Sequence, residues 1–492
     1  MPTSVLIAGA GPVGLTMAVE LARFQVPVRI IDKTAARTDK SKALAVWSRT
    51  LELLDRSGCA QTLIAAGRKT RAVDIMDGKK TIARVAFDEL DSPFRFVLMV
   101  PQSETERVLE EQLASYGVQV ERNVEFSGFS EVGSGVSCNV KHSDGRTEVI
   151  DADWLVGCDG AHSPIRHQLG MSFDGETVPG NFVLADVHVA GLQIPEDEFP
   201  IFWHRSGIVA FFPIAKDRYR VIADVGAGSS ADPTLADVQN IVDQRGPGDV
   251  VLSDCIWIAP FTVNERKVKD FRKGRVFLAG DAAHIHSPAG GQGMNTGMQD
   301  AFNLAWKLAM VIKNDASCDL LLDSYSVERS ANAAQVLKDS GRMLRVGTMQ
   351  NATGQVVRNF LMHQLFGLSF AKHIAAERLS ELTVGYDESP LNGTVAKGIG
   401  FPEPGHRIGG SDNYGEGDSP QFAIIAKDNG DVRDRIKRNP GFVEGAIRTS
   451  PASKGICLVR PDGYVAMTAS AEGWDDVDRY LDQMATTPAP QT

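Results

Sequence analysis

Long apolar runs, paired cysteines and an excess of basic side chains are all missing from this 492-residue sequence. No apolar run approaches the ~18 residues of a membrane-spanning helix, so we expect no membrane partner. The six cysteines form no CxxC pair, which argues against a dithiol centre and fits a reducing, cytoplasmic compartment. The first predicted strand starts by Val5, and we expect no signal peptide before it. The net charge of −11, without a basic stripe, argues against a nucleic-acid partner.

Glycine, by contrast, is abundant, at 47 residues, and it gathers in turns between strands and helices. The first turn, Gly9-x-Gly11-Pro12-x-Gly14, joins a short apolar strand to a helix, and the next strand ends at Asp32. Glycines at this spacing permit a tight turn and a close approach of the backbone to a pyrophosphate. The helix N-terminus attracts phosphate, and the carboxylate can accept hydrogen bonds from ribose hydroxyls. We therefore expect a dinucleotide-binding unit, and this turn alone leaves both NAD and FAD open.

A similar junction follows about 270 residues later, where a buried strand gives way to Gly280-Asp281 and then to the loop GGQGMN at a helix start. The carboxylate of Asp281 can hydrogen-bond the hydroxyls of a polyol such as the flavin ribityl chain. The loop, residues 290–295, presents bare N–H groups that stabilise negative charge, as on the N1/O2 edge of a reduced flavin. A structural turn is the alternative explanation, and it leaves the acid and the glycines unexplained.

Between these junctions, Asp159-Gly160 follows another strand and precedes Ser163, a pattern that fits a cofactor contact or a helix cap equally well. Taken together and in this order, the three motifs resemble those of the class A flavoprotein aromatic hydroxylases, the group that contains para-hydroxybenzoate hydroxylase and phenol hydroxylase. The similarity extends over roughly residues 4–345. It implies one FAD, held at its nucleotide end by the first turn and at its ribityl and ring end by the later one.

The resemblance also implies the reaction. An NADPH or NADH co-substrate reduces the flavin without a second Rossmann domain, O2 adds to form a flavin C4a-hydroperoxide, and a small aromatic, phenolic substrate is hydroxylated. Gln102 stands at the family's flavin-contacting glutamine, and Lys42 stands where an arginine is usual, which matters because lysine cannot form a bidentate fork. The cofactor-binding residues that the motifs and the resemblance together predict are Gly9, Gly11, Pro12, Gly14, Asp32, Lys33, Lys42, Gln102, Asp159, Gly280, Asp281, Pro288, Gly291, Gly293, Met294 and Asn295.

The substrate and catalytic residues are less defined by the sequence. The aromatic segment FWHRSGIVAFFP supplies the candidate substrate contacts Phe202, His204, Phe211 and Phe212, with packing in a core as the alternative. His204 and His286 are the candidates for proton transfer, and Pro288 is the family's flavin-proximal proline. We expect no metal site, since His284 and His286 have no third ligand in the sequence.

The expected architecture is α/β. A Rossmann-like FAD-binding domain comprises residues 1–175 and 263–345, and an inserted β-sheet substrate domain comprises residues 176–262, which a hairpin within 71–100 is expected to join. A helical connector over residues 346–390 leads to a C-terminal thioredoxin-like α/β module over residues 391–484. That module lacks CxxC, so we expect no redox activity from it.

Three other functions share parts of this pattern. A Baeyer–Villiger or epoxidising monooxygenase of a polyketide-like substrate would use nearly the same scaffold. A flavin halogenase would carry a Trp-x-Trp-x-Ile-Pro signature, which is missing. An NAD-dependent dehydrogenase or a non-catalytic dinucleotide-binding protein would leave the Asp281 turn unexplained. The sequence leaves the substrate, the choice between NADPH and NADH, and a monomeric or homodimeric state open.

Overall fold

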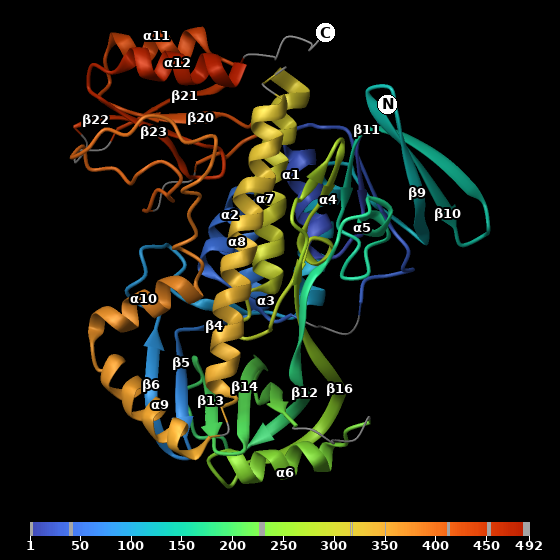
Figure 1. Ribbon diagram of the computed structural model, residues 1–492, viewed down its shortest axis with the longest axis vertical. Coiled ribbons are helices and arrows are strands. Elements are labelled where there is room, and N and C mark those ends of the chain that lie inside the picture. Colours follow the sequence, from blue (N-terminus) through green and yellow to red (C-terminus); the bar gives the residue numbers. More distant parts are fainter. Residues whose placement is uncertain are drawn as a thin grey trace.

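The computed structural model describes residues 3–38, 43–225, 232–314, 316, 318–349, 351–410, 414–449 and 454–485. They form an elongated molecule with the C-terminal module near one end and a large, mostly antiparallel sheet at the other (Figure 1). The predicted fold class is confirmed, since the chain combines a Rossmann-like sheet, a second sheet and a C-terminal α/β module. None of the helices in the described ranges is long and apolar enough to cross a bilayer.

The first sheet positions all three turns that the sequence singles out. Its order is β17-β18-β11-β1-β2-β8, with β10 and β9 added at β11. The strands are β1 (Thr3–Ala8), β2 (Val28–Asp32), β8 (Val120–Arg122), β9 (Val124–Val132), β10 (Gly135–His142), β11 (Thr147–Gly157), β17 (Arg272–Lys273) and β18 (Val276–Leu278). Parallel pairing aligns Ala8 with Gly157, and Gly157 with Leu278. The three turns therefore leave the sheet at the same edge, where α/β sheets bind their ligands.

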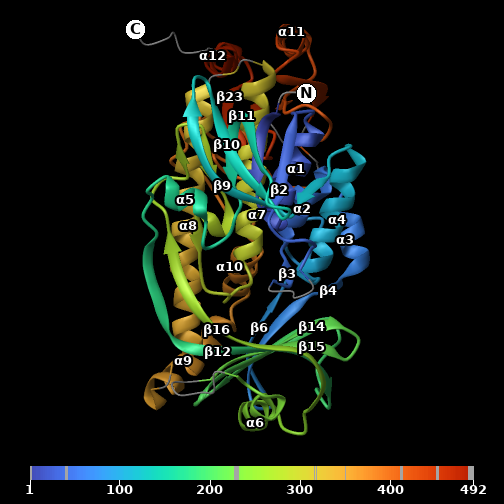
Figure 2. The same cartoon turned by 90° about the vertical axis from the view of Figure 1, so that its right-hand side faces the viewer.

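Helices pack on this sheet and form the middle of the molecule. They are α1 (Pro12–Arg23), α2 (Ser48–Arg56), α3 (Ala60–Ala66), α4 (Gln102–Ser115), α5 (Pro164–Gln168), α7 (Gly293–Asn314) and α8 (Cys318–Gly347). The long helices α7 and α8 run side by side along the molecule in both ribbon views (Figures 1 and 2). Helix α1 starts with Pro12, which suits a first helical position because its missing N–H has no partner there. Leu15 and Val19 of α1 are buried in the core.

The second sheet has eight strands in the order β19-β16-β12-β15-β14-β13-β5-β6. They are β5 (Ala72–Asp77), β6 (Lys80–Ala86), β12 (Asp174–Ala190), β13 (Glu198–His204), β14 (Gly207–Ala215), β15 (Arg218–Asp224), β16 (Val251–Lys267) and β19 (His284–Ile285). The β5–β6 hairpin joins this sheet by parallel pairing of β5 with β13. The long strands β12 and β16 connect it to the first sheet (Figure 2). Because β16 also pairs with β19, the second sheet continues directly into the loop after Ile285.

Residue alternation gives the second sheet two different faces. One face, with Val183, Phe211 and Val221, packs against α6 (Leu235–Arg245) in a separate core. The other face, with Phe182 and Ile208, looks toward the loop that follows β19, because both residues share a cluster with Ala289. A small third sheet has the order β3-β7-β4 and consists of β3 (Ala45–Val46), β4 (Arg68–Thr70) and β7 (Val97–Met99).

The C-terminal part begins with α9 (Ala352–Leu365) and α10 (Ser369–Leu379) and ends in a compact module. The module contains β20 (Phe422–Ile425), α11 (Gly430–Arg438), β21 (Val443–Arg448), β22 (Gly455–Val459), β23 (Val465–Ser470) and α12 (Trp474–Ala485). Its order β21-β20-β22-β23, with β20 and β21 parallel and the others antiparallel, fits the predicted thioredoxin-like arrangement. The turn between β22 and β23 inserts into the middle of the molecule, where the carbonyl of Asp462 accepts from Arg49 of α2.

Candidate functional site

Each of the three glycines in the first turn has different surroundings. Gly9 has φ +103°, and a Cβ there would clash with the carbonyl oxygen of Cys158. A Cβ on Gly14 would clash with the carbonyl oxygen of Gly9, so the helix packs directly on the turn. A Cβ on Gly11 would meet no atom within 4 Å. Only Gly11 therefore borders open space, at the N-terminus of α1, where a pyrophosphate fits.

Asp32 is fixed at the end of β2 by backbone contacts. Its Oδ2 accepts a hydrogen bond from Ala10 N at 2.7 Å, and its Oδ1 accepts one from Thr34 N at 2.8 Å. Arg122 Nη1 lies 3.9 Å from Oδ1. The carboxylate is thus held beside the first glycine turn, and the next residue, Lys33, is exposed. This position suits an acceptor for ribose hydroxyls.

The early and the late turns touch each other. Gly280 has φ +59°, and a Cβ built on it would lie 2.8 Å from Cγ2 of Val13 in the first turn of α1. Gly297 of α7 meets the same methyl, at 2.7 Å from its own built Cβ. This close packing places the short 3-10 helix Gly280–Ala282, with the exposed Asp281, next to the start of α1. The two turns therefore form one continuous cradle, as a single elongated cofactor requires.

Asp300, on the buried side of α7, holds the late turn in place. Its Oδ2 accepts from Gly280 N at 2.9 Å and from His284 Nε2 at 2.8 Å, and its Oδ1 accepts from Arg329 Nε at 2.7 Å. Burial alone would raise the pKa of Asp300, but its neighbours His284 and Arg329 outweigh burial and hold that pKa below its ordinary value. The carboxylate is therefore ionised, and it supports the Gly280 turn rather than facing a ligand.

The glycine loop before α7 is clamped to β3. Asn295 Oδ1 accepts from Trp47 N at 2.9 Å, and its Nδ2 donates to Ala45 O at 2.9 Å and to Gly291 O at 3.0 Å. Trp47 Nε1 donates to Gly290 O at 2.9 Å. Both amide hydrogens of the predicted cofactor residue Asn295 are thus used by the backbone. Its position supports a role in shaping the loop, while the first-turn N–H groups of α7, at Gly293 and Met294, have no intrahelical partner.

His286 lies half-buried beside this loop, with one ring nitrogen unused. Its ring stacks on that of His284 with centroids 6.2 Å apart and planes at 6°. Burial, and then the nearby His284, lower the pKa of His286 to about 4, so the ring is neutral near pH 7. Its Nδ1 lies 3.0 Å from the carbonyl oxygen of Ser287 and donates to it, which leaves Nε2 as an acceptor. Nε2 is buried without a hydrogen-bond partner, and a Cβ built on Gly293 would lie 3.7 Å from it.

Gln102 opens α4 near the first turn. The sequence pattern favours Ser103 as the helix cap, with Glu106 as its capping-box partner, but the helix starts at Gln102 after Pro101 and has no side-chain cap. The predicted capping box is therefore wrong, because the N-cap position falls on Pro101, two residues before Ser103. Gln102 Oε1 accepts from Ala43 N at 3.2 Å, and its Nε2 donates to Glu106 at 2.9 Å. The predicted Lys42 lies outside the described residues.

Asp159 lies at the same sheet edge, at the start of α5. Its Oδ2 accepts from Ile165 N at 3.2 Å, and Ser163 Oγ accepts from Arg166 N at 2.9 Å. Burial raises the pKa of Asp159. These bonds match the helix-cap explanation of this motif, and they leave the carboxylate close to the first glycine turn through Cys158.

The predicted substrate residues divide between the two faces of the second sheet. Phe202 and Phe211 are fully buried in the core beneath α6. His204, at the end of β13, has its Nδ1 2.8 Å from Ser206 Oγ, which in turn accepts from Arg245 of α6. Phe202 and Phe211 pack in this core, and His204 contacts Ser206 on the same side as α6. We therefore do not propose these three side chains as substrate contacts. Phe212 lies on the opposite face, in a cluster with Trp47.

A different apolar group meets the loop next to Pro288. Phe182, Val263 and Leu344 are buried there, and Ile208, Phe261, Val178 and Ala289 pack against them. The rings of Phe182 and Phe261 stack with centroids 5.4 Å apart. We call this group the Phe182 cluster. It places an aromatic wall from the second sheet directly beside the residue that follows Pro288.

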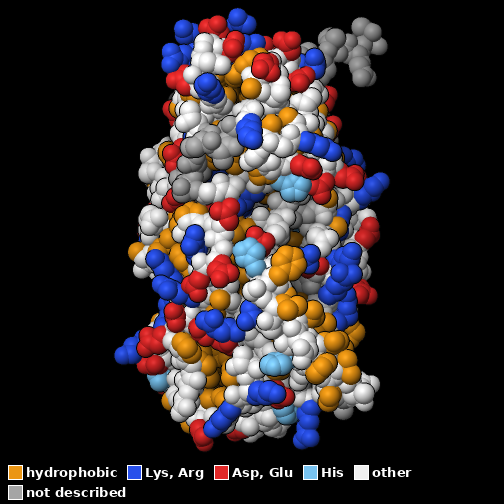
Figure 3. Space-filling view, turned by 90° about the vertical axis from the view of Figure 1, so that its left-hand side faces the viewer, with side chains coloured by type: hydrophobic (Ala, Val, Ile, Leu, Met, Phe, Trp, Pro, Cys, Tyr) orange, Lys and Arg blue, Asp and Glu red, His pale blue; other side chains and the backbone are white. Residues whose placement is uncertain are grey.

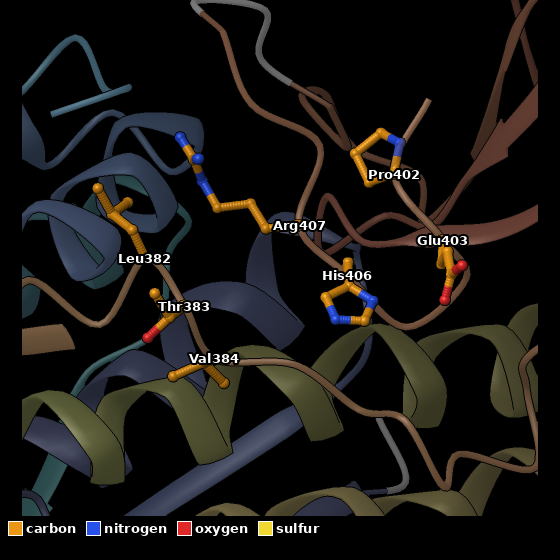
Figure 4. Close-up of a pocket in the computed structure, with 7 residues that line it drawn as sticks. All are labelled: Leu382, Thr383, Val384, Pro402, Glu403, His406 and Arg407. Carbon is orange, nitrogen blue, oxygen red and sulfur yellow. The ribbon is translucent and has the colours of Figure 1, made fainter. Parts of the chain in front are cut away.

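Other features do not fit a cofactor site. A cavity of about 360 Å³ lies between the segment after α10 and the C-terminal module, lined by Leu382, Thr383, Val384, Pro402, Glu403, His406 and Arg407. In Figure 4 the Arg407 side chain points away from Glu403 and His406. The Arg407 side chain forms an ion pair with Glu52, whose Oε2 accepts a hydrogen bond from Arg407 Nε at 2.9 Å. Across the described residues no group of three or more His, Cys, Asp or Glu side chains is arranged to hold a metal ion.

Sequence reasoning missed the residues that shape the cradle. Val13, Trp47, Gly297 and Asp300 are not among the predicted site residues, yet they fix the two turns relative to each other. A weak signal existed for Asp300, the acid that directly precedes the largely apolar helical stretch AFNLAWKLA. The other three act over long sequence separations that local patterns do not reveal.

Comparisons with known proteins agree with this geometry. A family model described as "FAD binding domain" matches residues 2–340. The chain is 37% identical to the 6-methylpretetramide 4-monooxygenase of Streptomyces rimosus over 419 residues, which cover 82% of this chain and 73% of that protein. It is 32% identical to the 12-dehydrotetracycline 5-monooxygenase/anhydrotetracycline 6-monooxygenase of Streptomyces rimosus subsp. rimosus, with 97% of each chain covered. The solved anhydrotetracycline hydroxylase from Streptomyces rimosus superposes with a TM-score of 0.78, at 30% identity, over 99% of this chain and 100% of that one.

Proposed function

Because this chain belongs to the FAD binding domain family of flavin-dependent monooxygenases, we propose that it hydroxylates a phenolic ring of a fused, polyketide-like aromatic substrate. The observation that carries the proposal is the Phe182 cluster, an aromatic and aliphatic wall against the loop of Pro288 and Ala289. A wall of stacked aromatic rings suits a flat, apolar ligand. The relatives named for tetracycline-type substrates cover nearly the whole chain, including the second sheet that forms this wall.

The residues of the cradle fit FAD. The open space at Gly11 and the start of α1 suit the pyrophosphate, Asp32 the adenosine ribose, and Asp281 the ribityl hydroxyls. The first-turn N–H groups of α7 suit negative charge at the edge of the ring system. When bound, FAD accepts a hydride from NAD(P)H and activates O2, chemistry that no side chain supplies.

The protein's own part is to hold the substrate, exclude water and manage a proton. The Phe182 cluster supplies a dry surface on the ring side of the loop. His286 is neutral near pH 7 and keeps Nε2 as a free acceptor behind the same loop. We infer that Nε2 of His286 accepts a hydrogen bond from the substrate hydroxyl, and that Pro288 lies at the reacting edge. A hydrogen bond from a phenol O–H to this nitrogen makes the aromatic ring more electron-rich and so favours attack on activated oxygen.

Three finer points stay predictions. The choice between NADPH and NADH is open, because the acid at the end of β2 serves the ribose of FAD. The sequence predicts a cytoplasmic protein, which the unpaired cysteines Cys59, Cys138, Cys158, Cys255 and Cys457 support. A monomer and a homodimer are distinguished by light scattering of the purified holoenzyme.

A substrate screen tests the proposed function. The holoenzyme is supplied with NADPH or NADH and with monocyclic phenols, naphthols and anthracene- or tetracene-type phenols, and the stimulated oxidation of NAD(P)H is measured. We expect the fused-ring phenols to stimulate most and to gain one oxygen atom from labelled O2. Product structures by NMR separate hydroxylation from Baeyer–Villiger insertion and from epoxidation. Turnover of monocyclic phenols alone contradicts the fused-ring substrate, and a purified chain that binds no FAD contradicts the whole proposal.

A further inference from the structure

Helix α9 is oriented with its polar side inward and its apolar side outward. Gln355 and Arg358 are buried, with 8% and 7% of their surface exposed, while Val356 is 71% and Phe360 is 62% exposed. Surface helices of globular proteins normally bury the apolar side. An apolar side that faces water lowers solubility unless another apolar surface covers it. Exposed apolar surfaces of this kind therefore mark interaction sites.

Specific contacts fix this orientation. Gln355 Nε2 donates to the carbonyl oxygen of Arg205 at 3.2 Å. Arg358 Nη1 donates to the carbonyl oxygen of Val346 at 2.9 Å, and its guanidinium lies 4.5 Å from the ring centroid of Trp203. Turning the helix over would leave these carbonyl oxygens without their donors and would put the guanidinium in water. The outward direction of the apolar side is therefore built into the fold.

The apolar surface extends beyond α9 into α10. Its members are large apolar residues with at least half of their surface exposed, and they are Val356, Val357, Phe360, Leu361, Leu365, Leu368 and Phe370. We call this set the α9–α10 apolar face. Figure 3 looks at the side of the molecule on which these two helices lie, and hydrophobic atoms gather over its lower part. The face is a convex pair of short helices and not a groove, so it suits a broad, deformable apolar layer better than a peptide.

The charge around this face is opposite to that of the chain. The chain has a net charge of −11, yet residues 341–376 contain no Asp or Glu. The same stretch contains Arg342, Arg345, Arg358 and Lys372. Arg342 and Arg345 are exposed at the end of α8, immediately before α9. Glu265 lies near Arg345 and Asp77 lies near Arg358, but the segment that carries the apolar face supplies cations and no anions of its own. Such a segment complements a layer that carries negative charge.

We propose that the α9–α10 apolar face rests on an anionic membrane surface. Phe360, Phe370 and the neighbouring aliphatic side chains enter the boundary between headgroups and acyl chains, and Arg342 and Arg345 lie among the headgroups. At 14 residues, α9 is about 21 Å long, which suits a helix lying in the plane of the interface. Contact of this kind needs no membrane-spanning helix.

A second copy of the chain is the main competing occupant, and charge disfavours it. A two-fold dimer through this face would place two copies of the same basic segment at one interface. Like charges brought together at an interface oppose association, whereas acidic headgroups neutralise them. The anionic bilayer is therefore the occupant that fits both the apolar and the basic residues.

Vesicle binding tests the proposal. The FAD-loaded, full-length protein is sedimented with vesicles of phosphatidylcholine alone and of phosphatidylcholine mixed with phosphatidylglycerol, and bound protein is quantified by flavin absorbance. We expect partition onto the mixed vesicles that weakens with salt. Phe360→Ser/Phe370→Ser should weaken it by roughly tenfold or more, because two exposed rings no longer enter the bilayer. Arg342→Gln/Arg345→Gln should weaken it by roughly tenfold on the mixed vesicles only.

Controls keep the outcomes distinct. Val149→Ser/Val251→Ser removes two apolar side chains that are 60% and 59% exposed elsewhere on the surface, and it should bind vesicles like the unaltered protein. Circular dichroism and FAD content confirm that each variant is folded. Absence of binding to mixed vesicles, or equal loss in the control pair, overturns the proposal. A dimer in light scattering that Phe360→Ser/Phe370→Ser dissociates, without vesicle binding, also overturns it in favour of a second copy.

Discussion

Arg460 and Glu328, 132 residues apart in the chain, form a two-pronged ion pair with Nη1–Oε1 at 2.7 Å and Nη2–Oε2 at 3.0 Å. Both side chains are fully buried. Lys307 Nζ donates to the same carboxylate at 2.8 Å. The pair therefore joins the β22–β23 turn of the C-terminal module to α8, one of the two long helices beside the cofactor cradle.

Breaking this pair should destabilise the whole protein. Arg460→Met leaves the carboxylate of Glu328 buried without its main partner, and loss of one partner of a buried pair costs about 3–5 kcal/mol. We expect a large drop in the thermal midpoint of the holoenzyme by differential scanning calorimetry. The matched control is Arg433→Met, which removes the exposed pair with Asp428 in the same module and should leave the midpoint unchanged. Similar midpoints for the two variants would contradict the role of the buried pair.

Gly11→Ala separates cofactor binding from folding. The added methyl meets no protein atom within 4 Å, so the variant should fold with an unchanged circular dichroism spectrum. The same methyl occupies space that we assign to the pyrophosphate, so the FAD affinity should fall by roughly tenfold or more, measured by titration of the apoprotein. Gly14→Ala is the contrasting variant, because its methyl clashes with the carbonyl of Gly9 and should reduce the yield of folded protein. An unchanged FAD affinity in Gly11→Ala would sink the assignment of this turn.

Asp281→Ala tests the late turn. A hydrogen bond to a charged group contributes about 1.5–3 kcal/mol, so the dissociation constant of FAD should rise by roughly tenfold to a hundredfold. Flavin fluorescence quenching measures it. Asp270→Ala removes another exposed carboxylate nearby in the sequence and should leave the constant unchanged. Equal constants for both variants would exclude Asp281 from the cofactor contacts.

Glu381 predicts a pH dependence of stability. Burial raises the pKa of this carboxyl to about 8, against hydrogen bonds from Thr296 and Gln299 that favour the ionised form. Between about pH 4.5 and pH 8 the folded state thus keeps a proton on Glu381, whereas the unfolded state, in which the carboxyl has its ordinary pKa of 4.5, releases it. The contribution of this protonated carboxyl to the free energy of unfolding is complete below about pH 4.5. It is lost as the pH rises toward 8, by up to about 1.4 kcal/mol per pH unit.

Glu381→Gln is the matching variant, because the amide keeps the shape and cannot ionise. Its thermal midpoint should fall less than that of the unaltered protein between pH 5 and pH 8, roughly in proportion to the linkage slope. Parallel curves for the two proteins would show that the carboxyl stays ionised in the folded state.

The sequence predicted the cofactor cradle well because its signals are local. The glycines at positions 9, 11 and 14 and the Gly280-Asp281 turn each follow a strand, and parallel strands bring their turns to one edge. The α/β fold class and FAD are confirmed. The sequence could not predict which face of the second sheet each strand residue occupies. Phe211 and Phe212 are neighbours in the chain, and only the position of α6 decides which of them packs in the core beneath that helix and which in the Trp47 cluster.

The clamp between Trp47 and Asn295 was also beyond the sequence. Its two residues are 248 positions apart, and the bond is to a backbone N–H that carries no residue-specific signal. The predicted capping box at Ser103 is wrong for a local reason, since the helix is capped at Pro101 and starts two residues earlier than a Ser103 cap implies. Contacts within one turn could therefore be predicted from the sequence, whereas contacts between segments far apart in the chain could not.

The buried turn between β22 and β23 has a consequence for biosynthesis. Arg460 leaves the ribosome after more than nine-tenths of the chain, so a nascent protein holds Glu328 and Lys307 in an unfinished interior until translation is nearly complete. A message truncated shortly before this turn would yield a product that contains every glycine of the cradle but leaves an ionised carboxylate without its guanidinium. We expect such products to be much less stable than the finished enzyme, because the last strands supply the partner of this buried carboxylate.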